Sequence, residues 1–215
     1  DILSKVIAYS CHGFSCYGKG FLEEATNYLL KGIDFSARIK HLYFLPTVNE
    51  FFGEVYSEIG KYQTAIDHYK KAIWFREQSK LFPSFAKLTK IALARAMVLN
   101  NERDIYMESL YEYVSENKIK QCDGWMRRYI GEILLNIDDQ HISEAEEWIN
   151  KAIKADKMNG MMFHLCRDLS LYVELLKRKG DQSKARETLG KSIEILKECG
   201  ADGWVEKYEK ELAKL

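Results

Sequence analysis

The feature that most constrains the fold of this chain is a unit of about 40 residues that recurs along it. The clearest copy contains Phe52-Gly53, Gly60, Ala65 and Ala72. Gly53 is a small residue where two helices can approach closely, and Gly60 stands where a first helix would end and the chain would turn. Ala65 and Ala72 are seven residues apart, so they lie on one face of a second helix. The unit is predicted to be a helical hairpin.

Other copies keep the same spacing of small residues. Ala65 and Ala145 are 80 residues apart, so a degenerate copy is expected between them, with Ala94 and Tyr106 at its small and packing positions. Three pairs have a spacing of 40 residues: Gly13 with Gly53, Ala25 with Ala65, and Ala145 with Ala185.

Composition favours helices throughout. The 215 residues include only two prolines, Pro46 and Pro83, and each is expected at the start of a first helix, where a missing N–H costs nothing. The periodicity predicts five paired helices and one last helix: Ile2–Lys19 with Phe21–His41, Thr47–Ile59 with Tyr62–Leu81, Ser84–Asn100 with Glu102–Asn117, Asp123–Ile137 with Ser143–Lys157, Met161–Lys179 with Gln182–Cys199, and Asp202–Lys214.

This pattern resembles the tetratricopeptide repeat, a helix-turn-helix unit that stacks into a right-handed superhelix. The resemblance implies an all-α solenoid, here of about five repeats, closed by a capping helix with Trp204 and Tyr208 on its apolar face. The spacing in this chain makes the repeats ~40 residues long, more than the ~34 usual for the family, so longer helices are expected. We expect residues 1–215 to form a single domain, with repeats at about 2–41, 46–82, 83–118, 123–159 and 161–200 and the cap at 202–214. The last repeat, through Lys184-Ala185-Arg186, is similar to the C-terminal repeats of bacterial signalling ATPases and nucleotide cyclases.

Two segments imitate chemical motifs. The stretch from Gly13 to Gly20 has the spacing of a phosphate-binding loop, but Gly20 replaces the required Ser or Thr and no β-branched strand precedes it. Cys11, His12 and Cys16 could begin a zinc site, but no second cluster supplies the remaining ligands. Residues two apart on a helix, such as His164 and Cys166, point to different sides and make no nucleophile pair. We therefore expect no enzyme activity, no metal and no cofactor.

The resemblance implies that the first helix of each pair lines a concave groove that holds partners. Projected onto that register, the groove residues alternate in charge around one aromatic anchor, which suits an extended peptide or a partner helix. A clamp for a C-terminal carboxylate is disfavoured, because Glu50, Glu54 and Glu58 would repel it. The candidate partner-binding residues are Asn49, Glu50, Glu54, Arg95, Trp125, Arg128, Glu132, Arg167, Glu174 and Arg178.

Charge and cysteine usage restrict the partners further. Lys plus Arg and Asp plus Glu both total 32, so the basic excess that nucleic acids and membranes attract is absent. Five cysteines without paired spacing are typical of reduced thiols in a cytoplasm. The sequence thus favours a non-catalytic protein-interaction module, expected as the regulatory or sensor tail of a larger bacterial cytoplasmic signalling protein. The alternative is a receptor domain for a short signalling peptide, and an enzyme is the third choice; self-association and contact with other domains of a longer chain stay open.

Overall fold

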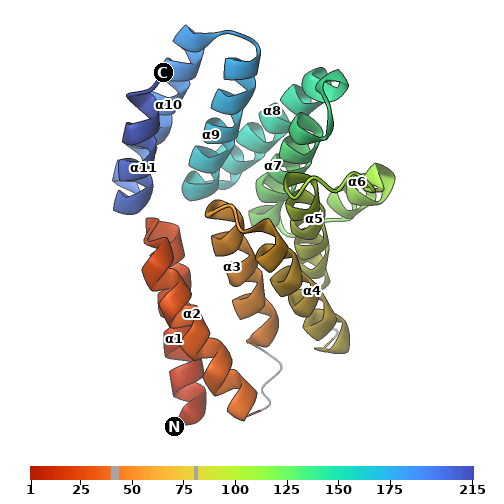
Figure 1. Ribbon diagram of the computed structural model, residues 1–215, viewed down its shortest axis with the longest axis vertical. Coiled ribbons are helices and arrows are strands. Elements are labelled where there is room, and N and C mark those ends of the chain that lie inside the picture. The colour runs from red at the N-terminus through yellow and green to blue at the C-terminus, as the bar shows by residue number, and fades with distance from the viewer. Residues whose placement is uncertain (40–43, 80–81) are drawn as a thin grey trace. The chain divides into compact units, whose positions relative to one another are not determined.

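The computed structural model describes residues 1–39, 44–79 and 82–215, and within these it is all-α (Figure 1). The predicted helical-repeat class is confirmed. No helix in these ranges has the length and apolar character needed to cross a bilayer. The predicted helix ends at His41 and Leu81 lie outside the described residues. The helices are α1 (Ile2–Lys19), α2 (Leu22–Arg38), α3 (Leu45–Glu58), α4 (Tyr62–Ser79), α5 (Pro83–Leu99), α6 (Met107–Ser115), α7 (Lys120–Ile137), α8 (Ile142–Asn159), α9 (Met162–Arg178), α10 (Gln182–Glu198) and α11 (Asp202–Leu212), with a short 3₁₀ turn at Asp139–His141 before α8.

The chain forms two compact units, Asp1–Glu102 and Arg103–Leu215. In the first unit α1 pairs with α2 and α3 pairs with α4, while α2 also packs on α3 and α4 on α5. In the second unit α7 pairs with α8 and α9 with α10, and α8 packs on α9 and α10 on α11 (Figure 1). Within each unit, successive helices therefore pack on one another, as stacked helical hairpins do.

The small residues of the repeat lie at the predicted close approaches. A Cβ on Gly53 would come within 2.3 Å of the Tyr69 ring, and a Cβ on Gly13 within 2.7 Å of the Leu29 side chain. Gly60 ends the first helix of its hairpin with φ +75°, a left-handed conformation in which glycine meets no steric penalty. The alanines at the repeat position of the second helices are all fully buried: Ala25, Ala65, Ala145 and Ala185. The predicted register is confirmed for these hairpins.

The degenerate third repeat is where the prediction was wrong. A helix was expected over Glu102–Asn117, but α6 spans only Met107–Ser115 and Tyr106 is 76% exposed instead of packed. The cause lies at the end of α5, where Asn101 adopts φ 65° and the Glu102 N–H donates to the Met97 carbonyl, so that the chain leaves the helix. The boundary between the two units falls directly after Glu102.

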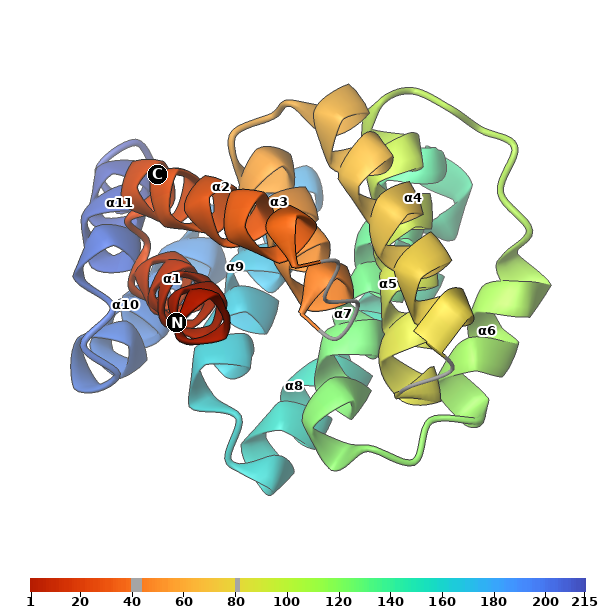
Figure 2. The same ribbon diagram turned by 90° about the horizontal axis from the view of Figure 1, so that it is seen from below.

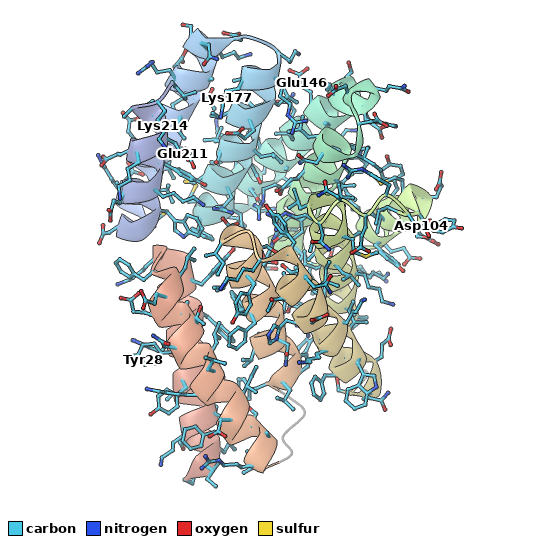
Figure 3. The ribbon with its side chains drawn as sticks, in the orientation of Figure 1. Tyr28, Asp104, Glu146, Lys177, Glu211 and Lys214 are labelled. Atoms are coloured by element: carbon cyan, nitrogen blue, oxygen red, sulfur yellow. The ribbon has the colours of Figure 1, made fainter. Side chains whose placement is uncertain are left out.

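The last helix behaves as a cap within its unit. Trp204 and Tyr208 are each 1% exposed, and α11 packs against α10. The Arg167 guanidinium of α9 lies 4.2 Å from the Trp204 ring centroid, and Arg167 Nη1 donates to the Tyr208 hydroxyl at 3.2 Å. The labels of Lys177 and Glu211 in Figure 3 show where α9 and α11 lie.

Candidate functional site

A buried ion pair joins three helices in the first unit. Glu50 of α3 pairs with Arg76 of α4, and the other Glu50 oxygen accepts a hydrogen bond of 2.6 Å from the Thr89 hydroxyl of α5. The Arg76 guanidinium also lies 5.3 Å from the ring centroid of Phe85 on α5. Because Glu50 and Arg76 are each less than 5% exposed, this network holds the interior of the unit together rather than facing solvent.

Two further polar side chains of α3, Asn49 and Glu54, contact residues of α4. Asn49 Oδ1 lies 3.0 Å from His68 Nδ1, and the imidazole stacks on Phe52 with 4.8 Å between ring centroids. Burial lowers the pKa of His68 to about 4, with the nearby Lys71 adding to the effect, so the ring is neutral at pH 7. Glu54 accepts a 2.7 Å hydrogen bond from the Tyr69 hydroxyl.

Arg95 of α5 is also buried. It lies 3.9 Å from the carboxylate of Glu58 on α3. The acidic row Glu50, Glu54 and Glu58 is thus engaged with Arg76, Tyr69 and Arg95, and its repulsion of an incoming carboxylate stays a prediction.

The second unit contains a corresponding network with the charges exchanged. Arg128 of α7 lies 3.1 Å from Asp168 of α9, and Arg128 also donates to the His164 carbonyl at 3.3 Å. Asp156 of α8 is fully buried against α7, where a Cβ on Gly124 would meet its carboxyl group. One guanidinium therefore faces two buried carboxyl groups.

The two aspartates resist ionisation. Burial raises the pKa of Asp156 to about 6, while Arg128 acts in the opposite direction. Burial raises the pKa of Asp168 well above its usual value, again opposed by Arg128, and the neighbouring Asp156 raises it further. A single cation balances only one carboxylate, so ionisation of the second aspartate is opposed.

The two networks occupy equivalent positions of the repeat. Glu50 and Arg128 stand three residues before the close-approach glycines Gly53 and Gly131 of their first helices. Arg76 and Asp156 are 80 residues apart, as are the buried alanines of the same helices, Ala65 and Ala145. Thr89 and Asp168 occupy matching positions on the next helices along the chain, α5 and α9. The sequence analysis missed Arg76, Thr89, Asp156 and Asp168 as a set, although the repeat spacing itself relates them.

Trp125 lies beside this second network. Its indole stacks on the His164 ring with 4.5 Å between centroids and meets Tyr129 edge-on at 6.1 Å. Burial lowers the pKa of His164 well below its usual value, and Arg128 and Arg167 add to the shift. The side chain of Trp125 is half-buried, and its indole N–H has no acceptor among the described residues.

The remaining candidates are more accessible. Glu132 and Arg167 are half-buried, and Glu174 and Arg178 are exposed. Arg178 of α9 donates to the Asn136 side chain at 2.9 Å and to a carbonyl of α7, while Glu174 pairs with Lys177 at 2.8 Å. A neighbouring bridge joins Glu146 of α8, labelled in Figure 3, to Lys179 at 2.8 Å.

The structure therefore divides the predicted groove residues. Five of them are buried in interior networks, and the others are half-buried or exposed. The physical reason for this burial is that each of the five bridges its first helix to the second helix or to the next hairpin, and these contacts remove it from water. These five are Asn49, Glu50, Glu54, Arg95 and Arg128.

The segments that imitate chemical motifs are helical. The stretch from Gly13 to Lys19 belongs to α1, and Gly20 caps that helix, so it forms no strand–loop–helix cradle for phosphate. His12 meets Tyr28 edge-on at 4.1 Å, and Cys16 is buried. Within the described residues, no three His, Cys, Asp or Glu side chains gather in a way that could hold a metal ion.

Comparison with known proteins agrees with the hairpin geometry of one repeat. Residues 48–74, most of α3 and α4, match the family model of the tetratricopeptide repeat. The α3–α4 hairpin matches a tetratricopeptide repeat. Among solved structures, the chain is similar to "MamA 41-end from Desulfovibrio magneticus RS-1" at 18% sequence identity and a TM-score of 0.47, over 90% of this chain and 96% of that chain. No curated protein sequence matches the chain.

Proposed function

We propose that this chain is a non-catalytic protein-interaction module. The support is the succession of helical hairpins in each unit and the match of α3–α4 to a repeat family whose members bind proteins. The polar residues that could suggest chemistry instead bridge helices, as Glu50 does with Arg76 and Thr89.

The observation that carries the proposal is the environment of Trp125 on α7. A half-buried indole supplies apolar area of the kind found at protein-binding hot spots, while its N–H is itself buried. Glu132 on α7 and Arg167, Glu174 and Arg178 on α9 belong to the first helices of the same unit. We therefore place the partner-binding face on α7 and α9.

The experiment is an affinity measurement on a partner captured by the wild-type chain. Trp125→Ala should weaken its binding by ~2 kcal/mol or more if the indole is a hot spot. Glu147→Lys, an exposed change on α8, should leave affinity unchanged. Helix content measured by circular dichroism should be the same in all three proteins. If Trp125→Ala binds the partner with wild-type affinity while Glu147→Lys loses binding, the binding face lies on the second helices instead.

More specifically, we propose a regulatory or sensor tail of a larger bacterial cytoplasmic signalling protein. Support comes from the last repeat, in which Ala185 is fully buried and Gly200 precedes a closing helix anchored by Trp204. The five cysteines are all free thiols, which suits a reducing compartment. An ATPase, cyclase or DNA-binding domain encoded in the same chain supports this role. A chain that carries only a short helix-turn-helix segment beside the repeats favours the receptor for a signalling peptide.

A further inference from the structure

A surface hollow of about 500 Å³ lies in the second unit, where the end of α6, the start of α7 and the end of α8 meet. Figure 2 shows the connection from α6 to α7 that forms one side of it. Hollows of this size accommodate a ligand or a few side chains of a partner. It exists because α6 ends early, at Ser115, and leaves residues 116–119 as a connecting segment.

Cations dominate the rim of this hollow. Five line it, whereas Asp123 is the one carboxylate among its lining residues and is already engaged by Arg127 at 2.8 Å. The cations are Lys118, Lys120, Arg127, Lys151 and Lys154. In a chain whose net charge is zero, this is a local concentration of positive charge.

Three of these lysines have no carboxylate partner in the part of the chain that the structure describes. Lys118, Lys120 and Lys154 are exposed and make no ion pair there, whereas Lys151 lies 3.6 Å from Glu147 and 4.9 Å from the Trp148 ring centroid. The three ammonium groups are therefore available to an anion from outside.

The backbone at the rim adds to this preference. The hollow includes the first turn of α7, whose N-cap residue Ile119 contributes no side-chain hydrogen bond to the helix. The N-terminal end of a helix carries a partial positive charge. Asn117 holds the approach to the helix in place, since its side chain hydrogen-bonds both the N–H and the carbonyl of Ile119, at 3.1 and 2.9 Å.

Part of the lining of the hollow is apolar. It includes Val114, Ile119, Ala155 and Met158, and the Met158 side chain is 75% exposed. A flexible thioether next to a basic rim suits a ligand that brings an apolar side chain between carboxylates. A small inorganic anion would leave these apolar side chains uncovered.

We propose that this hollow binds an acidic peptide segment of a protein partner, with an apolar side chain against Met158 and carboxylates at Lys118, Lys120 and Lys154. Nucleic acid and anionic membranes fit less well. Glu112 of α6 lies close by in sequence and would repel an extended polyanion. This proposal rests on the proposed function as an interaction module, but it does not depend on Trp125. The acidic-peptide site and the α7–α9 binding face can therefore fail independently.

The test uses the full chain and a fluorescent ten-residue peptide with Leu at its centre and Asp or Glu on both sides, followed by anisotropy at 50 and 300 mM NaCl. Saturable binding that weakens at high salt is expected. Replacing both Lys118 and Lys154 by Gln should weaken it about fivefold or more. Lys157→Gln is the matched control, because Lys157 is exposed on α8 but does not line this hollow, and it should stay within about twofold.

Several outcomes would overturn the proposal. An equal loss for Lys157→Gln would mean diffuse attraction to the unit rather than a site. Equal affinity for a peptide with Asn and Gln in place of the acids would remove the electrostatic basis. Tighter binding of single-stranded DNA or of phosphatidylserine vesicles would assign the hollow to another class of ligand. The Trp125→Ala variant should bind the acidic peptide with wild-type affinity. The peptide result therefore does not depend on whether α7 and α9 form the partner-binding face.

Discussion

Gly124 of α7 lies directly against the carboxyl group of Asp156 of α8, so that a Cβ at Gly124 would come within 2.1 Å of the Asp156 Cγ. No side chain larger than hydrogen fits there while Asp156 keeps its place between α7 and α9. The glycine is therefore what allows a carboxyl group to be buried beside Arg128.

Replacing Gly124 by Ala should destabilise the protein by about 1–3 kcal/mol, because Asp156 must move or the two helices must separate. Urea unfolding followed by circular dichroism measures the effect. Gly190→Ala is the control: it lies inside α10 with nothing within 4 Å of its Cβ position, so it should gain up to about 1 kcal/mol from helix propensity. Equal effects of the two changes would mean that the Gly124 contact is unimportant.

Replacing Asp156 by Asn should make stability less dependent on pH. The folded-state pKa of Asp156 is raised from 3.8 to about 6, so its contribution is favourable below about pH 4 and is lost as the pH rises toward 6. At pH 7 the variant should be more stable than wild type, by on the order of 1–3 kcal/mol. Urea unfolding at pH 4 and pH 7 gives the two differences. A variant that is less stable than wild type at pH 7 would contradict the raised pKa.

Replacing Arg76 by Met should be among the most damaging single changes in the first unit. It leaves the Glu50 carboxylate buried without its cation, at an expected loss of about 3–5 kcal/mol. The double variant Glu50→Met with Arg76→Met should recover most of that loss, because two apolar side chains of similar length then fill the space. The melting temperatures of the single and double variants test this. A double variant as unstable as the single one would mean that lost packing, rather than an unpaired buried charge, causes the destabilisation.

Replacing Ala65 by Leu should cost roughly 1–3 kcal/mol, since the alanine is fully buried between helices of the repeat. Ala37→Leu, at an exposed position of α2, should change stability by no more than about 0.5 kcal/mol. Hydrogen exchange should locate the loss mainly in α3, α4 and their neighbours, because contacts in repeat proteins are local. An unchanged melting temperature for Ala65→Leu would contradict the register.

The limits of sequence reasoning are clearest in the third repeat and in the polar networks. Ala94 is buried as expected, but Tyr106 is exposed, because the chain leaves the helix at Asn101 and the charged run after it offers no apolar face to restart one. Helix ends set by glycine, such as Gly60 and Gly200, were easier to place than this one, which depends on a left-handed asparagine.

By itself, the sequence determined the hairpins other than the third, their 40-residue register and the small residues at the helix contacts. These follow from local spacing, because positions three, four and seven apart on a helix share a face whatever surrounds it. The tertiary structure alone decided which polar residues leave water. Glu50 meets Arg76 from 26 residues away, and Arg128 meets Asp168 from 40 residues away, on other helices. Burial of a charge depends on neighbours that several helices bring together, so the same register holds an acidic residue on the first helix in one unit and a basic one in the other.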